Sequence, residues 1–136
     1  MKIIEQEEVR KLLQPKDCIQ LMAEALKGLE SGEYAQPARL ITVMPNTAKF
    51  GFMPAYVGDY FGAKVISAFA PNMGTKYPSH IGYVMLFESA HSTVAGMIEA
   101  GSITEIRTGA VSAAATDLLA RKDSHKLALI GAGAQA

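Results

Sequence analysis

The last residues of the chain carry the pattern that points most directly to chemistry. Leu127 to Ile130 are four apolar residues, and the sequence G-x-G-x-x-A follows them. A short apolar strand that leads into this turn is typical of dinucleotide-binding folds, in which the phosphates lie at the N-terminus of the next helix. Gly131 would allow the tight turn, and Gly133 would let the backbone approach the phosphates. We therefore predict binding of NAD or NADP, with an ordinary glycine-rich turn as the alternative.

The second chemical feature is a set of three cations in apolar or small-residue segments. They are Arg39, Lys64 and Arg107. A cation on a strand usually lies on its solvated face, so each of the three could be an ordinary surface residue. If they converge, a guanidinium can hold a carboxylate through two parallel hydrogen bonds while the lysine adds a point charge. They are therefore candidates for a carboxylate-binding pocket.

The other reactive side chains give weaker signals. His80 and His91 lack the spacing of a metal-binding pair. Cys18 falls on the apolar stripe of an expected helix, where a thiol would be buried and inert. We therefore expect no metal site and no nucleophilic cysteine.

Composition restricts the class of protein. The chain has 136 residues, 49% of them hydrophobic, which suits one domain with a substantial core. Thirteen basic residues balance thirteen acidic ones, so no excess of charge favours nucleic acid or an anionic membrane as a partner. The single cysteine excludes an intrachain disulfide and favours a cytoplasmic location. We find no pattern of a membrane helix or of a secretory signal.

Hydrophobic periodicity predicts the elements that position these residues. Two helices are expected near the N-terminus, 7–13 and 16–31, the second ended by Gly32. Gly51 and Pro54 suggest an irregular edge or a bulge in one of the following strands. Those strands, the last two of which should form an antiparallel hairpin, are Ile3-Ile4, 39–44, 50–57, 62–69, 82–87 and 93–99. The order of the elements predicts an α+β domain with a mostly antiparallel sheet.

A helix over residues 102–120 is expected to connect two parts of the chain. Ser102 and Glu105 match a capping box at its start. The apolar run 126–130 should then form the first strand of a dinucleotide-binding domain. We therefore divide the chain at residue 122 and expect residues 123–136 to begin a truncated domain, so that the chain is the front portion of a longer enzyme.

Several segments occur in the order seen in one family of enzymes. The chain resembles the ornithine cyclodeaminase/mu-crystallin family over nearly its whole length. The R-T pair, followed by small residues, a strand and G-x-G-x-Q-A, is more specific than the glycine turn alone, which many dehydrogenases share. The matching segments are Met53-Pro54-Ala55, Lys64-Val65, Pro78-Ser79-His80 with Gly82, Glu105 to Ala110, and Gly131 to Ala136.

This resemblance implies an NAD(P)-dependent enzyme of amino acids or cyclic imines that forms a homodimer. Residues 1–122 would be the substrate-binding and dimerisation domain, and residues 123–136 the first strand and glycine turn of a Rossmann domain. The resemblance assigns the substrate carboxylate to Arg39, Lys64 and Arg107, with Lys64 also a candidate catalytic residue. It assigns cofactor contacts to Thr108, Gly131, Gly133, Ala134 and Gln135.

The resemblance leaves several activities open. In ornithine cyclodeaminase the cofactor oxidises the amino acid at Cα, ammonia is lost as the ring closes, and the hydride is returned; the essential aspartate would lie beyond residue 136. Members that use ornithine carry an acidic residue where this chain has Gly51, and the family commonly has Gln where this chain has Ile81. An alanine dehydrogenase or a ketimine reductase of the same family is therefore an alternative. So is a non-catalytic, mu-crystallin-like protein that binds a small ligand.

Overall fold

The computed structural model describes all residues from Met1 to Ala136. Three α-helices and six strands are present, close to the expected bounds, so the predicted α+β class is confirmed. The elements in chain order are β1 (Lys2–Ile4), α1 (Gln6–Leu12), α2 (Pro15–Ser31), β2 (Leu40–Val43), β3 (Lys49–Val57), β4 (Tyr60–Ala68), a 3-10 turn (Ala70–Asn72), β5 (His80–Glu88), β6 (Val94–Glu99) and α3 (Ala100–Leu119).

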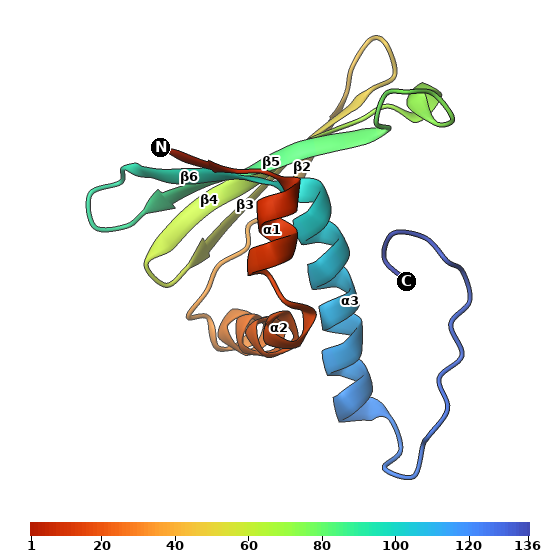
Figure 1. The fold of residues 1–136 in the computed structure, drawn as a ribbon. Coiled ribbons are helices and arrows are strands. Elements are labelled where there is room, and N and C mark those ends of the chain that lie inside the picture. The colour runs from red at the N-terminus through yellow and green to blue at the C-terminus, as the bar shows by residue number, and fades with distance from the viewer.

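All six strands belong to one mixed sheet, in the order β1-β6-β5-β4-β3-β2. Every neighbouring pair is antiparallel except β1 and β6, which run parallel. The expected hairpin between β5 and β6 is present. Helices α1, α2 and α3 lie on one face of the sheet and leave the other face without a helical cover (Figure 1).

The core lies where α2 and α3 meet the sheet, and small side chains dominate it. Cys18 of α2 and the α3 residues Ala110 and Ala114 are buried, so the two helices can approach closely. Gly32 ends α2 in the left-handed conformation, with φ of 79°, as the glycine at that position predicts. Only 11 of the 136 residues are buried, so much apolar surface stays exposed.

No bulge occurs at Gly51 or Pro54, so that alternative is wrong, but Pro54 does lie on an edge of the sheet, beyond the end of β2. β3 pairs with β4 in continuous register through both residues. Tyr56 donates its backbone N–H toward Ala35, on the β2 side of β3. The nitrogen of Pro54, two residues earlier, faces the same side. β2 ends where Leu40 pairs with Phe52, so the missing N–H of Pro54 costs no ladder hydrogen bond.

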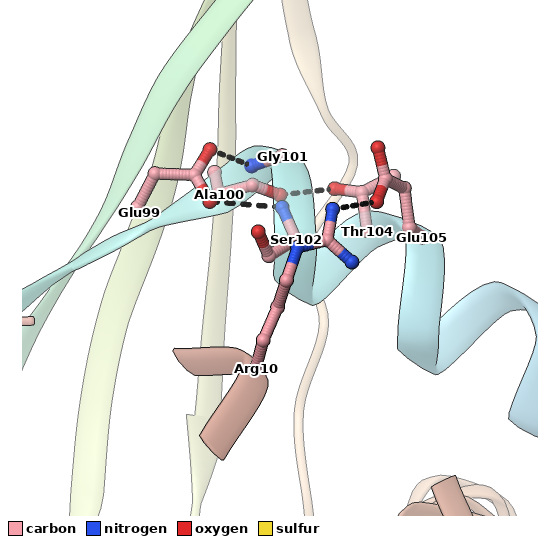
Figure 2. Close-up of polar contacts among 7 residues, drawn as sticks. All are labelled: Arg10, Glu99, Ala100, Gly101, Ser102, Thr104 and Glu105. Atoms are coloured by element: carbon pink, nitrogen blue, oxygen red, sulfur yellow. Dashed lines mark hydrogen bonds and ion pairs between the residues drawn. The ribbon is translucent and has the colours of Figure 1, made fainter. Parts of the chain in front are cut away.

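The expected capping box at Ser102 is also wrong, because the helix begins earlier. Glu99 is the N-cap of α3, and its carboxylate accepts from the backbone N–H groups of Gly101 and Ser102 (Figure 2). The side chain of Glu99 thus satisfies two of the free donors at the helix start. Ser102 lies inside the first turn, where its hydroxyl is buried and has no hydrogen-bond partner.

The expected strand at 126–130 is not formed. Residues after α3 contain no helix or strand, and the segment turns back alongside α3 (Figure 1). The side chains of Leu127 and Ile130 are 81% and 100% exposed. An apolar segment becomes a strand only beside another strand that pairs with its backbone, and none of the six strands pairs with this one.

Candidate functional site

Lys64 lies near the middle of β4, on the face of the sheet that the helices cover. It pairs across the sheet with Met53 of β3 and Val84 of β5. Its Nζ donates a hydrogen bond to Oγ1 of Thr104 in α3, at 3.2 Å. An ammonium group has three donors, so two N–H groups of Lys64 are left for another acceptor.

A cavity of about 400 Å³ lies between α2, α3 and the central strands. Lys64 and Arg107 both line it, as does Thr104. Most of the other lining side chains are apolar, and no aspartate or glutamate is among them. The cavity thus combines two cations with an apolar wall, which suits a small molecule that carries a carboxylate and little other charge.

Electrostatics connects all three predicted cations. Burial lowers the pKa of Lys64 from its ordinary value, and the positive charges of Arg107 and Arg39 lower it further. The ion pairs of the chain are Lys2–Glu8, Arg10–Glu105, His91–Glu88 and Arg121–Asp123. None of them involves Arg39, Lys64 or Arg107. The structure thus brings Lys64 and Arg107 to one cavity without a carboxylate partner, whereas Arg39 lies just before β2 and does not line that cavity.

A second cavity, of about 370 Å³, lies on the other side of the Lys64–Thr104 contact. Both of these residues line it, together with His80 and Glu105. Two residues of the glycine-turn segment, Ala134 and Gln135, complete its wall. The fold thus brings part of the predicted cofactor segment to the same cavity as Lys64.

The start of α3 is held by contacts to the rest of the domain (Figure 2). Arg10 of α1 forms an ion pair with Glu105, and Glu99 caps the helix. Thr104 donates its hydroxyl proton to the carbonyl of Ala100 at 2.6 Å. These contacts set the position of the helix turn that carries Thr104 next to the sheet.

The remaining predicted cofactor residues are not gathered around a cavity. Thr108 lies on α3 and donates its hydroxyl to the carbonyl of Thr104 at 2.6 Å. Gly131 has a φ of 105°, a conformation that favours glycine. No heavy atom lies within 4 Å of a Cβ built on Gly131 or Gly133. The backbone therefore has the freedom that a phosphate turn needs, but residues 131–136 contain no helix and do not by themselves form an anion site.

The one cysteine of the chain is poorly suited to nucleophilic chemistry. Cys18 is buried, which raises the pKa of its thiol, and the charge of Arg107 offsets part of that rise. A thiol held protonated in this way suits packing rather than nucleophilic attack.

His, Cys, Asp and Glu side chains form no group of three that could hold a metal ion. None of the helices combines the length and the apolar character needed to cross a bilayer.

Thr104 is the site residue that sequence reasoning missed. A spacing of three residues places it on the same helical face as Arg107, and both line the apolar cavity. That spacing was the available signal. A threonine inside a helix is so common, however, that only the contact with Lys64 distinguishes it.

Comparison with known proteins identifies the family of the chain. The model of the ornithine cyclodeaminase/mu-crystallin family matches residues 1–136, and the chain belongs to that family. Ketimine reductase mu-crystallin from Mus musculus is 35% identical over 118 residues, which are 85% of this chain and 37% of the mouse protein.

Solved structures show the same fold. The Delta(1)-pyrroline-2-carboxylate reductase of Thermococcus litoralis, in complex with NADH and L-proline, is similar with a TM-score of 0.90 and 31% identity, over 99% of this chain and 43% of that one. An archaeal alanine dehydrogenase dimer with bound NAD has a TM-score of 0.92 and 26% identity, over 98% of this chain and 41% of that one. The chain spans about two fifths of the length of these relatives.

Proposed function

We propose that this chain is the substrate-binding portion of an ornithine cyclodeaminase-like, NAD(P)-dependent enzyme that transfers hydride to or from a small amino acid or cyclic imine. The observation that carries the proposal is the pair of cations, Lys64 and Arg107, that line an apolar cavity with no acidic residue and take part in no ion pair. Gathering like charges costs free energy, which a bound carboxylate would recover. The relatives named above, two reductases and a dehydrogenase, support the reaction class.

Within this proposal each predicted residue has a role. Arg107 and Arg39 hold the substrate carboxylate with their guanidinium groups, and Lys64 binds it from the sheet beside the reacting carbon. Thr108 and the glycine-turn segment 131–135 contact the cofactor, which supplies the hydride. Residues 1–122 then form the substrate-binding and dimerisation domain, and residues 123–136 begin the nucleotide-binding domain.

A direct experiment is titration of the isotope-labelled 136-residue chain with L-proline, followed by NMR. We expect saturable shifts at residues around Lys64 and a Kd about tenfold higher in Arg107→Ala, since losing a charge-assisted hydrogen bond costs about 1.5–3 kcal/mol. Arg121→Ala is the matched control, because that guanidinium pairs with Asp123 in the exposed turn after α3. Absence of saturable binding in the wild-type chain would remove the carboxylate site.

A second candidate within the family is an imine reductase or an alanine dehydrogenase, and the apolar cavity favours either over an enzyme of ornithine. No acidic side chain lines the cavity, so the distal ammonium of ornithine would be desolvated there without a partner. A Cβ on Gly51 would lie 2.8 Å from Ile66 Cγ1 and 2.9 Å from Ile41 Cδ1, so isoleucines occupy the space around that position. In the same titration we expect L-ornithine to bind at least tenfold more weakly than L-proline. Equal affinities would reject this preference.

We also propose a homodimer that forms through the open face of the sheet. Side chains alternate along β3, so those pointing away from the cavity residue Met53 project from the open face. Leu40, Phe52 and Ile81 are 62%, 41% and 55% exposed, and the rings of Phe61 and Phe87 stack at 5.3 Å. A monomer rarely leaves so many large apolar side chains in water, and a second copy would cover them.

The buried free thiol of Cys18 is compatible with the cytoplasmic location that we propose for the protein.

A further inference from the structure

The hydroxyl of Thr104 has two hydrogen-bond partners: it donates to one and accepts from the other. It donates its only proton to the carbonyl of Ala100 at 2.6 Å, a contact drawn in Figure 2. Its oxygen then offers lone pairs alone, and it accepts from Nζ of Lys64 at 3.2 Å. The helix backbone thereby orients the Thr104 oxygen as an acceptor for the ammonium.

The bond to the helix backbone is not what distinguishes Thr104. The hydroxyls of Thr108, Ser112 and Thr116 donate in the same way to the carbonyls four residues earlier. Thr104 alone among these hydroxyl residues also contacts a cation. Thr104 and Lys64 are, moreover, the two residues that line both the 400 Å³ and the 370 Å³ cavities, so their contact lies in the wall between them.

Lys64 needs such a partner because the groups around it do not hold it in place. Its side chain is flexible, and Arg107 and Arg39 repel its ammonium. Glu105 is the one carboxylate that lines the 370 Å³ cavity, and it is paired with Arg10. His80 also lines that cavity. Thr104 is the only hydrogen-bond acceptor that the chain gives to Lys64.

We propose that Thr104 is a positioning residue, which holds the Lys64 ammonium in the wall between the two cavities so that its two free N–H groups can donate to a ligand carboxylate. This inference rests on the carboxylate site proposed above. Thr104 itself does not touch the ligand. By restricting the Lys64 side chain before the ligand binds, Thr104 lowers the conformational entropy that binding costs, which is a gain from preorganisation.

The test compares Thr104→Val and Thr104→Ser in the 136-residue chain. Valine keeps the shape and removes the acceptor, whereas serine keeps the acceptor. We expect Thr104→Val to raise the Kd for L-proline about tenfold and Thr104→Ser to stay close to wild type. We also expect the valine variant to lower the pKa of Lys64, followed by NMR of labelled lysine, because the lost acceptor favoured the charged form. Thr116→Val removes an equivalent backbone bond far from Lys64 and should change neither value.

Two results would overturn the inference. The first is an unchanged Lys64 pKa and Kd in Thr104→Val. The second is an equal loss in the valine and serine variants, which would assign the effect to packing. If the wild-type chain does not bind L-proline, the proposed carboxylate site fails. Even then, the pKa of Lys64 in the wild type, Thr104→Val and Thr104→Ser decides whether Thr104 holds the ammonium.

Discussion

The ring of Tyr34 packs directly against Gly28, which lies inside α2. A Cβ built on Gly28 would lie 2.3 Å from Cδ2 of Tyr34, closer than two carbon atoms can approach. The backbone N–H of Tyr34 also donates to the carbonyl of Gly28 at 3.0 Å. Tyr34 and Ala35 line the apolar cavity, and Ala35 forms a bridge to Tyr56 of β3. The glycine thus allows the chain after α2 to return to the sheet and close one end of the cavity.

We predict that Gly28→Ala destabilises the fold although alanine is the better helix former. Displacing the tyrosine ring should cost up to about 3 kcal/mol because the overlap is severe, and this exceeds the gain of about 1 kcal/mol from helix propensity. Urea unfolding measures the difference. Gly109→Ala is the matched control, because no atom lies within 4 Å of a Cβ built there, and it should stabilise α3 by about 1 kcal/mol. If both substitutions changed the free energy of unfolding in the same direction, the role of Gly28 would be contradicted.

The start of α3 leads to a second prediction. Glu99→Ala should lower the free energy of unfolding by about 1 kcal/mol, the usual cost of losing an N-cap. Ser102→Ala should cost nothing or stabilise slightly, because its buried hydroxyl has no partner. Thermal unfolding of the two variants shows whether Glu99 or Ser102 caps α3. A larger loss from Ser102→Ala than from Glu99→Ala would restore the capping box expected from the sequence.

Lys64 should reduce stability while it contributes to binding. Burial and the neighbouring charges of Arg107 and Arg39 lower its pKa in the folded protein below the ordinary 10.5. Between the folded pKa and 10.5 the unfolded chain binds more protons, so stability rises with pH across that window. Lys64→Met should therefore stabilise the chain at pH 7 by about 1 kcal/mol, the scale of a partly screened charge. The difference in free energy of unfolding between Lys64→Met and the wild type should narrow as the pH approaches 10.5. A difference that widens would refute the explanation.

The open sheet face predicts an effect on the oligomeric state. Phe52→Lys places a charge on that face, on β3, and should convert a dimer into a monomer in sedimentation velocity, because burying an unpaired ammonium is costly. Leu118→Lys also replaces an exposed apolar residue, 74% accessible near the end of α3, and should leave the dimer intact. A monomeric wild-type chain at micromolar concentration would count against the dimer.

The glycine-turn segment predicts a negative result for the 136-residue chain. Residues 131–136 offer backbone freedom but no helix N-terminus, so we expect no saturable change in NADH fluorescence on addition of the chain. Saturable binding that Gly133→Val abolishes would show that these residues form a cofactor site without a following helix.

Much of the fold was determined by the sequence alone. Apolar periodicity located α1, α2 and β2 to β6 closely, because the period of 3.6 or 2 is imposed by local backbone geometry. Gly32 marked the end of α2 for an equally local reason, its left-handed φ. The order of the family's short motifs identified the family, because several weak matches in one order are specific together.

Other features were decided only by the tertiary structure. Lys64 and Arg107 come from β4 and α3, which are distant in the chain, and only the packing of the helix on the sheet brings them to one cavity. The same packing selected Glu99 rather than Ser102 as the cap and placed Thr104 against Lys64. The apolar segment 126–130 has the pattern of a strand but no partner to pair with. Periodicity encodes which way a side chain faces, whereas contacts between elements depend on long-range pairing that no short window of sequence contains.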